Sequence, residues 1–457
     1  MEDICGRIAH WAQERRWDAM AAPSRERIRN LFIDTLGCAF AGRPHPAVAQ
    51  STTVARALWN GHEATGLGSG QTFGLLGAML DSGAAIRALD LNDFYWGPGL
   101  GGHPSDIFAT ALAVAESRDL SLADMLAAVA TGYEFYTRLM DLMRAGDPPW
   151  PWDHTSACAP CATLIAAQLL KPTEEQLAQA LAISLARAPV FSALRAGKIS
   201  SVKAAAPALG QADGVIALQL SMAGMTGPRG AVDGPRGLEA IIVEGSSLDH
   251  LLPGEGDVER VMDITVKRFP CMGTGQAATA VAVALHEQLG PRIADIEAIT
   301  LQVSNSGIVR RQTADVYRRP DRRETADHSF YAIFGIALVD GKLSPDQFAA
   351  RRWESPEVAR VIDSLTLIPD LPGEAEGIFP ARGHARMRDG TVVTIDMPYA
   401  PGHRLNALSD AQFDAKFHAF SEPVIGERRA SEILRLCRSP VEQIRVRDIL
   451  RACAEPN

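Results

Sequence analysis

The chain has 457 residues, a formal net charge of −9, and a composition that is 47% hydrophobic, 22% charged and only 6% aromatic. This length allows two or three domains, and the abundance of alanine favours a helix-rich globular protein over a β-sandwich or a disordered chain. The net negative charge argues against a nucleic-acid partner, because neutralising phosphates requires clustered Lys and Arg. No stretch approaches the roughly 18 uninterrupted apolar residues of a membrane span, and no signal-peptide pattern is found, so we expect a cytoplasmic protein without a membrane partner.

Helices can be predicted from periodicity and from capping residues. Residues 27–42 place Ile28, Leu31 and Leu36 on one helical face and end in Gly42, which we expect to be the first residue beyond the helix. Four further helix starts have a capping box, in which a Ser or Thr is followed three positions later by an acidic or amide residue. These boxes are Ser121/Asp124, Thr173/Gln176, Ser344/Gln347 and Ser409/Gln412.

The loop LDLNDFYWGPGLGGHPSD, residues 89–106, contains a G-x-G-x-x-G pattern from Gly97 to Gly102. A dinucleotide loop needs a buried strand before the glycines and backbone donors within them, whereas here acidic residues precede the pattern and Pro98 removes a donor. We therefore expect Asp93 and His103 to serve proton transfer at either end of this loop. The alternative is that Asp93 caps a turn and His103 is a surface residue.

The seven cysteines are scattered, and only Cys158 and Cys161 form a C-x-x-C pair. No second pair at ligand spacing completes a zinc or iron–sulfur site, so we interpret both as core residues at the start of a helix. The sequence thus predicts no metal, flavin or nicotinamide cofactor.

Two later stretches hold polar residues where helical patterning does not require them. His154 and Thr155 precede a long Ala-rich helix, at whose N-terminus an anion such as a carboxylate is favoured. Lys203 enters an apolar, small-residue helix that we expect to be mostly buried, and a buried lysine needs an anionic partner or a lowered pKa. The alternative for Lys203 is a snorkelling side chain. Lys267 and Arg268 lie beside a predicted junction between a strand and a helix.

Strand signals are confined to about residues 265–400. Residues 296–303 are rich in apolar and β-branched side chains, and residues 384–397 place Asp389-Gly390 between two alternating arms, which predicts a hairpin. We therefore predict a mainly α fold: a large all-helical body, residues 1–265, completed by residues 401–457, with a smaller inserted α+β lid domain, residues 266–400.

Six motifs in chain order resemble those of the MmgE/PrpD family, and the likeness extends from about residue 25 to about residue 435. They are DTLGCAFAG, LDLNDFY with HPSD close behind, DHTSAC, VKAAAPALGQADG, VKRFPC and TADHSFYAIFGIALVDG. The family includes 2-methylcitrate dehydratases, cis-aconitate decarboxylases and iminodisuccinate epimerases. The resemblance implies a homodimer and a metal-free site between body and lid, with the catalytic residues Asp93, His103, His154, Lys203 and Lys267.

Three departures from the family pattern concern the site. Many members place a histidine nine residues after the lysine that corresponds to Lys267. This chain has Gln276 there, which cannot shuttle a proton near neutral pH. The family tyrosine falls at Ala332, and Tyr331, one position earlier, is turned by about 100° on a helix. Arg87 replaces a usual histidine. The predicted substrate-binding residues are Thr155, Gln276, Tyr331 and Arg268.

The resemblance implies a cofactor-independent lyase acting on a small polycarboxylate. We expect a dehydratase of a hydroxylated di- or tricarboxylate, in which a base removes a proton α to a carboxylate and cationic groups stabilise the developing charge. The alternatives are a decarboxylase of a cis-aconitate-like acid, an epimerase of an iminodisuccinate-like acid, and a non-catalytic member. Which histidine acts as acid and which as base stays open at this point.

Overall fold

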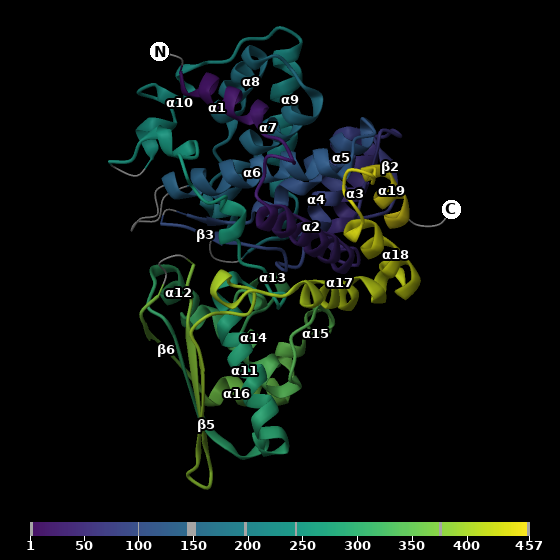
Figure 1. Ribbon diagram of the computed structural model, residues 1–457. Coiled ribbons are helices and arrows are strands. Elements are labelled where there is room, and N and C mark those ends of the chain that lie inside the picture. Colours follow the sequence, from purple (N-terminus) through teal and green to yellow (C-terminus); the bar gives the residue numbers. More distant parts are fainter. Residues whose placement is uncertain are drawn as a thin grey trace. The chain divides into compact units, whose positions relative to one another are not determined.

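The computed structural model of the chain describes residues 3–98, 100–143, 152–195, 199–242, 245–373 and 377–454. It divides into two compact units: unit 1 comprises Met1–Ala88, Asn92–Ile264 and Ser409–Asn457, and unit 2 comprises Leu89–Leu91 and Thr265–Leu408. The fold class predicted from the sequence is confirmed, because the protein is mainly helical with a small α+β part (Figure 1).

Unit 1 is built from helices and two very short antiparallel ladders. Its helices are α1 (Ile4–Glu14), α2 (Ala22–Gly42), α3 (Pro46–Leu58), α4 (Leu75–Arg87), α5 (Phe108–Ser117), α6 (Leu122–Leu142), α7 (Cys158–Leu170), α8 (Glu174–Arg187), α9 (Ala206–Met222), α10 (Gly230–Asp233), α17 (Asp410–Ile425), α18 (Glu427–Arg438) and α19 (Val446–Cys453). Strand β1 (Ala64–Thr65) pairs with β2 (Thr72–Phe73), and β3 (Tyr95–Trp96) pairs with β4 (Gly101–Gly102).

The core of unit 1 lies around α2, α4, α6 and α7, which are buried along nearly their whole length. Helix α7, whose residues are nearly all apolar or small, belongs in the interior of a large protein, because no face of it suits water. The C-terminal helix α17 packs on α2 (Figure 1). A buried ion pair between Lys416 and Asp34, with 2.6 Å between Nζ and Oδ1, joins these two helices. Helices from both ends of the chain therefore share one core.

All four predicted capping boxes are present, at the starts of α6, α8, α15 (Pro345–Ala349) and α17. The prediction for Gly42 is wrong: it is the last residue of α2 rather than the first beyond it. A Cβ at Gly42 would collide with the carbonyl oxygen of Ala85 on α4. The glycine is there because two buried helices approach closely, and a local capping rule does not contain that information.

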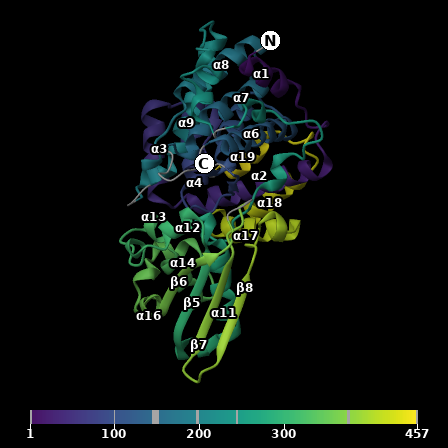
Figure 2. The same ribbon diagram turned by 90° about the vertical axis from the view of Figure 1, so that its left-hand side faces the viewer.

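Unit 2 combines a four-stranded sheet with short helices. The strands are β5 (Ile296–Ser304), β6 (Leu365–Leu371), β7 (Ala381–Met387) and β8 (Val392–Met397), and the helices besides α15 are α11 (Gln276–Leu289), α12 (Gly307–Gln312), α13 (Arg323–Ala326), α14 (Phe330–Asp340) and α16 (Pro356–Ser364). The strand order is β6-β5-β7-β8, with β5 parallel to β6 and the other pairs antiparallel. Helix α11 packs against β7 and β8 (Figure 2).

The predicted strand at residues 296–303 and the predicted hairpin are both confirmed, by β5 and by β7–β8. Gly390 in the hairpin turn has φ 82°, a left-handed conformation that glycine adopts without strain. Strand β6 was not predicted. It contains Pro369 and lies at the edge of the sheet, where a missing N–H donor is tolerated.

Within the described part of the chain, every helix is too short or too polar to span a bilayer.

Candidate functional site

The glycines of the G-x-G-x-x-G pattern allow close packing. Gly101 and Gly102 form β4, paired with Trp96 and Tyr95 of β3. A Cβ on Gly102 would collide with the hydroxyl of Tyr136 and lie 3.0 Å from the Cβ of His154. The paired strands β3 and β4 therefore pack tightly against two polar side chains. Gly99 lies outside the described residues.

Asp93 is a buried carboxylate whose two oxygens both accept hydrogen bonds. Its Oδ1 accepts from Ser105, from the backbone N–H at 3.0 Å and from the hydroxyl at 2.6 Å, and its Oδ2 accepts from the Tyr133 hydroxyl at 2.7 Å. Burial raises the pKa of Asp93 to about 6, although the hydrogen bonds from Ser105 and Tyr133 oppose the shift. Asp93 thus fixes the turn that carries His103, as the turn-capping alternative proposed.

His103 is oriented by the backbone of Asp93. Its Nδ1 lies 2.6 Å from the carbonyl oxygen of Asp93, and a carbonyl oxygen can only accept. Nδ1 therefore carries a proton, and Nε2 is the nitrogen of the neutral ring that carries none. The backbone N–H of His103 donates to the Tyr136 hydroxyl at 3.0 Å.

His154 is placed beside His103 by the one-turn helix His154–Ala157 that leads into α7. The two imidazole centroids lie 5.0 Å apart, edge to face at 72°. His154 Nδ1 lies 3.0 Å from the Tyr136 hydroxyl oxygen, which is also 3.4 Å from the carbonyl oxygen of His154. Burial raises the pKa of Tyr136 well above its usual value, so the hydroxyl keeps its proton, and its single O–H can donate to one of these two acceptors.

The protonation state of His154 decides whether its Nδ1 or the Tyr136 oxygen accepts. If Nδ1 of a neutral ring accepts from Tyr136, Nε2 carries the proton; in the protonated ring Nδ1 donates to the Tyr136 oxygen, the Tyr136 hydroxyl donates to the His154 carbonyl, and Nε2 again carries a proton. This Nε2 lies 3.9 Å from Asp153 Oδ1, a carboxylate that favours the protonated form of the ring. One ring of the pair thus offers a proton acceptor at Nε2, and the other offers a proton donor.

Asp153 connects His154 to two further groups. Its Oδ1 accepts from the Thr155 backbone N–H at 3.0 Å and from the Thr155 hydroxyl at 2.7 Å, and its Oδ2 accepts from Arg195 Nε at 2.9 Å. Burial alone would raise the pKa of Asp153, but the charges of Arg195 and His154 and the bonds from Thr155 lower it to about 2. The anion at this helix N-terminus is therefore Asp153 itself, which occupies the Thr155 amide expected to face a ligand.

Arg87 belongs to a buried polar network under the same turn. It donates to Asn92 Oδ1 at 3.2 Å, and Asn92 Nδ2 donates to Ser105 Oγ at 3.0 Å and to Asp106 Oδ1 at 2.9 Å. Burial raises the pKa of Asp106 to about 7, against the opposing charges of Arg87 and Arg195. The residue that replaces the family histidine is thus part of the framework that holds the site.

Lys203 lies in the one-turn helix Ser201–Ala204 before α9, and only 1% of its surface is exposed. Its predicted burial is confirmed. The expectation that the following helix is mostly buried is wrong, because Leu209 and Ile216 on α9 are 46% and 42% exposed in the described chain. The small residues Ala208 and Gly214 of α9 pack on α4 and α7, respectively.

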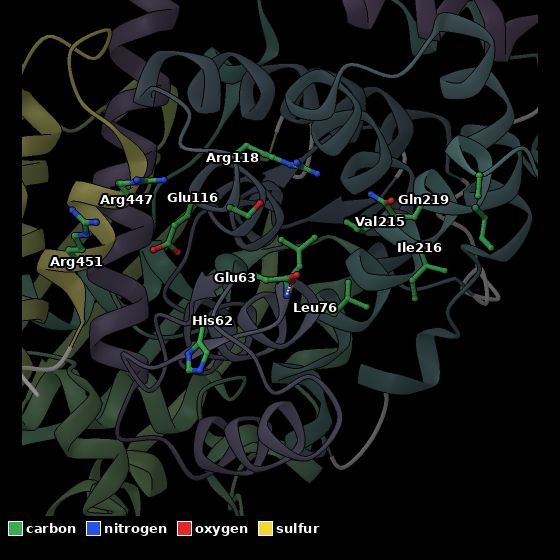
Figure 3. Close-up of a pocket in the computed structure, with 14 residues that line it drawn as sticks. His62, Glu63, Leu76, Glu116, Arg118, Val215, Ile216, Gln219, Arg447 and Arg451 are labelled. Carbon is green, nitrogen blue, oxygen red and sulfur yellow. Dashed lines mark hydrogen bonds between the residues drawn. The ribbon is translucent and has the colours of Figure 1, made fainter.

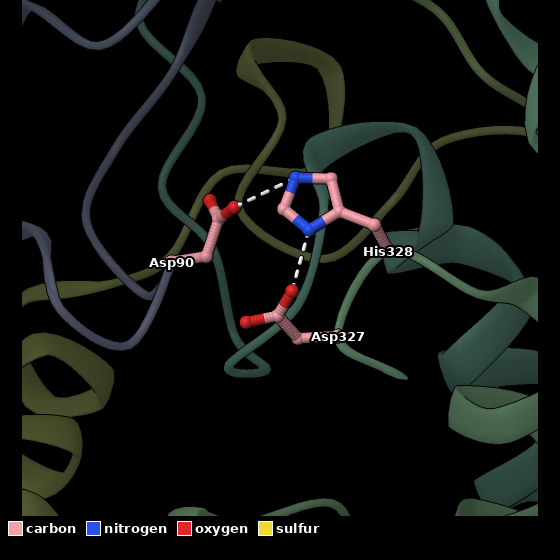
Figure 4. Close-up of side chains that lie close together, drawn as sticks. All are labelled: Asp90, Asp327 and His328. Atoms are coloured by element: carbon pink, nitrogen blue, oxygen red, sulfur yellow. Dashed lines mark hydrogen bonds and ion pairs between the residues drawn. The ribbon is translucent and has the colours of Figure 1, made fainter. Parts of the chain in front are cut away.

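Lys267 forms a second cluster, within unit 2. Its ammonium donates to the Asp90 carboxylate in an ion pair and to the Asp90 carbonyl oxygen at 3.0 Å. Asp90 has φ 53°, an uncommon left-handed conformation that these bonds help to hold. His328 bridges Asp90 Oδ2, 3.1 Å from its Nε2, and Asp327 Oδ1, 2.5 Å from its Nδ1 (Figure 4).

Asp90, Asp327 and His328 are the described residues whose ligand atoms come close enough, within 4.8 Å, to hold a metal ion. The Lys267 ammonium already supplies a positive charge to Asp90, so this carboxylate is compensated without a metal ion. Cys158 and Cys161 are fully buried free thiols, and burial raises the pKa of each well above its usual value. This is the inert core environment predicted for them.

Three of the predicted substrate-binding residues make contacts within unit 2. Gln276 accepts from the backbone N–H groups of Arg268 and Phe269 at 3.0 and 3.1 Å and donates to the Phe269 carbonyl at 2.9 Å. Its amide therefore supports the loop after Lys267. The Tyr331 hydroxyl donates to the Thr313 carbonyl at 3.2 Å, and the exposed Arg268 lies over the Phe269 ring.

A cavity of about 870 Å³ opens elsewhere in unit 1 (Figure 3). It is lined by apolar residues such as Val215 and Ile216 and by charged residues such as Glu116, Arg118 and Arg447. Neither histidine of the pair lines it, so it is separate from the histidine cluster.

Sequence reasoning missed several members of these clusters. Tyr136 lies within the apolar run of α6, and Arg195 lies in a stretch that carries no motif. Asp327 and His328 were inside the quoted TADHSFY motif, and Asp153 directly precedes His154. A search for adjacent acidic and histidine residues would have found these three.

Nearly the whole chain is similar to known proteins. The MmgE/PrpD N-terminal domain matches residues 6–251, and the MmgE/PrpD C-terminal domain matches residues 269–439. The chain is 25% identical to the cis-aconitate decarboxylase of Mus musculus, covering 92% of this chain and 84% of the mouse protein. It is 22% identical to the cis-aconitate decarboxylase of Aspergillus terreus (94% and 91% covered) and 23% identical to the 2-methylcitrate dehydratase of Cupriavidus necator (85% and 84% covered).

Proposed function

Because the chain belongs to the MmgE/PrpD family, we propose that it is a cofactor-independent lyase that eliminates water from a small hydroxylated di- or tricarboxylate. The observation that carries this proposal is the pair of adjacent imidazoles, in which the Asp93 carbonyl directs the proton of His103 to Nδ1 and the Asp153 carboxylate lies beside Nε2 of His154. An elimination needs a base at one atom and an acid at the next, and this pair offers both.

The partners of the two rings assign the two roles. His103 Nε2 removes the proton on the carbon α to a substrate carboxylate, the electron pair forms the carbon–carbon double bond, and the hydroxyl group leaves from the adjacent carbon. The protonated His154 ring gives its Nε2 proton to that hydroxyl, which departs as water and leaves His154 as a neutral imidazole. Asp153 favours this role for His154, because its carboxylate stabilises the protonated ring.

The lysines are proposed to act electrostatically. Deprotonation builds negative charge on the substrate carboxylate, and a buried cation such as Lys203 stabilises that charge strongly in a water-poor environment. Lys267 is proposed to hold Asp90 and its loop through the ion pair in unit 2. Gln276, Tyr331 and Arg268 remain proposed contributors to substrate binding, as does Thr155.

The second candidate is a decarboxylase of a cis-aconitate-like acid. It is favoured by the two relatives named cis-aconitate decarboxylase, which match 92% and 94% of this chain. Loss of CO₂ leaves a carbanion that needs one proton, and the protonated His154 ring would deliver it from Nε2 and become a neutral imidazole. An epimerase would use both histidines on one stereocentre.

Proton NMR in D₂O with a panel of citrate-like, cis-aconitate-like and iminodisuccinate-like acids tests the proposal. Dehydration produces a vinylic resonance with the carbon skeleton intact, whereas decarboxylation shortens the skeleton and epimerisation exchanges one α-proton without changing connectivity. We expect the vinylic product. Binding of these acids in a thermal-shift assay without any turnover would favour the non-catalytic alternative.

The proposed assembly is a homodimer and the proposed location is the cytoplasm. Sedimentation of the purified chain at several concentrations tests the first, and a species at the mass of one chain at every concentration would contradict it.

A further inference from the structure

Arg195 has donors that the fold does not use. It ends the one-turn helix Ser192–Arg195, and its Nε donates to Asp153 Oδ2 at 2.9 Å. Its side chain is 16% exposed, and both Nη1 and Nη2 are buried without a hydrogen-bond partner among the described residues. Buried N–H donors are nearly always paired, because leaving them unpaired costs free energy. Two such donors on one guanidinium therefore indicate that a ligand supplies the acceptor.

The geometry of the Arg195 guanidinium indicates which kind of ligand it can bind. With Nε fixed by Asp153, the two terminal nitrogens form the edge of a planar fork, which matches the two oxygens of a carboxylate. Asp153 contacts both Arg195 and His154, so Arg195 belongs to the same cluster as the proposed proton donor.

The nearby carboxylates do not satisfy this fork. The Oδ1 of Asp153 accepts a hydrogen bond from Thr155. Asp106, whose pKa is raised by burial against the opposing charge of Arg195, accepts a hydrogen bond from Asn92 through its Oδ1. Asp106 Oδ2 is itself buried without a hydrogen-bond partner in the described chain. An external carboxylate is thus the acceptor that fits the two Nη groups.

We propose that Arg195 binds one carboxylate of the substrate through Nη1 and Nη2, while Asp153 holds the plane of its guanidinium. The inference rests on the proposed function and names its recognition group. Arg195 places that carboxylate next to His154, which positions the adjacent carbon for the proton transfers. The residue determines specificity: acids that lack this carboxylate lose the contact.

The test measures binding and turnover separately in Arg195→Gln and Arg195→Lys. Binding is measured by calorimetry with inert saturated acids: propane-1,2,3-tricarboxylate, glutarate, which lacks the central carboxylate, and 2-methylsuccinate, which lacks a terminal one. Arg187→Gln is the matched control, because Arg187 is 64% exposed on α8 and pairs only with Asp213 among the described residues. Circular dichroism confirms that each variant is folded.

We expect Arg195→Gln to raise the Kd of the tricarboxylate by about tenfold to a hundredfold, as loss of charge-assisted hydrogen bonds does. Of glutarate and 2-methylsuccinate, the one that lacks the carboxylate bound by Arg195 should have the same Kd for wild type and variant. KM should rise with Kd while kcat changes less, and Arg195→Lys should restore only part of the affinity because its ammonium is not a fork.

A Kd of the tricarboxylate and a KM of the substrate that both stay within about twofold of wild type in folded Arg195→Gln would overturn the inference, as would a wild type that binds none of the acids. The same holds if Arg187→Gln weakens binding equally. If wild type binds the tricarboxylate through Arg195 but converts no acid, the inference stands and the proposed function fails. If the wild type turns over its substrate and Arg195→Gln leaves turnover and binding unchanged, the proposed function stands and the inference fails.

Discussion

At the scale of single residues, the Tyr136 hydroxyl is the link between the two histidines, since it accepts from the His103 backbone and contacts His154 Nδ1. Tyr136→Phe removes the hydroxyl that orients the His154 ring through its contact with Nδ1. We expect kcat/KM to fall by about tenfold to a hundredfold, with unfolding temperature little changed. Steady-state kinetics checks this, with Tyr399→Phe, at a partly exposed tyrosine, as control. Unchanged kinetics would mean that Tyr136 does not set the proton donor.

Asp106 is predicted to make stability depend on pH. Burial raises its pKa from 3.8 to about 7, so the folded chain binds this proton more tightly than the unfolded chain. The stabilisation is fully present below about pH 4 and is lost as the pH rises to about 7. Asp106→Asn cannot titrate, so its unfolding midpoint should fall less than that of wild type between these pH values. Parallel midpoints in thermal melts would contradict the assignment.

Some residues of the candidate site could be predicted from the sequence, and others could not. His103, His154, Lys203 and Lys267 could be singled out because charged or titratable side chains in glycine-rich or apolar stretches are unusual, and the structure gives each a buried or clustered position. The partners Tyr136, Arg195 and Asp106 could not, since their meaning depends on contacts between segments far apart in the chain. For Gln276, the sequence signalled the missing histidine, but only the structure revealed the backbone groups that its amide supports.

At the scale of elements, the β3–β4 hairpin is predicted to tolerate no side chain at Gly102. A Cβ there would collide with the Tyr136 hydroxyl and crowd His154, so Gly102→Ala should displace both. We expect a loss of kcat/KM of about tenfold or more, with the overall fold retained, because the alanine methyl acts on the histidine pair.

The control is Gly230→Ala, because a Cβ at Gly230 meets nothing within 4 Å. Equal activity in the Gly102 and Gly230 variants would show that the hairpin does not position the pair.

Helices α2 and α17 are predicted to depend on their buried ion pair. Lys416→Met leaves the Asp34 carboxylate buried without its cation, which typically costs about 3 to 5 kcal/mol. Urea unfolding measures the loss. The double variant Asp34→Leu with Lys416→Met removes both charges and should recover most of it. If the single variant is as stable as wild type, the pair does not join these helices in solution.

Elements specified by local chemistry were predictable, and those specified by packing were not. The four capping boxes and the Asp389-Gly390 turn satisfy hydrogen bonds or dihedral angles within a few residues. Gly42 and β6 depend on partners elsewhere: the Ala85 carbonyl in one case and the parallel strand β5 in the other. A proline within a short run of apolar residues argues against a strand, so the sequence of β6 did not predict one.

At the scale of the whole molecule, family membership and a mainly helical fold followed from six motifs in order, because motif order reports on the entire chain. The proposed chemistry also has a consequence for the whole protein: activity should survive a chelator. Buried Lys267 already compensates Asp90, so no cation is needed at Asp90, Asp327 and His328. Metal analysis of active protein before and after EDTA checks this, and stoichiometric metal that tracks activity would contradict it.

The most direct test of the central claim is a double-mutant cycle on the histidine pair, with kcat/KM measured by the proton NMR assay. If His103 is the base and His154 the acid of one elimination, His103→Gln and His154→Gln should each lower kcat/KM by at least about a hundredfold. The double variant should lose little more than the worse single variant, because groups that act as a unit are not additive. Near-normal turnover in either folded single variant would contradict the account.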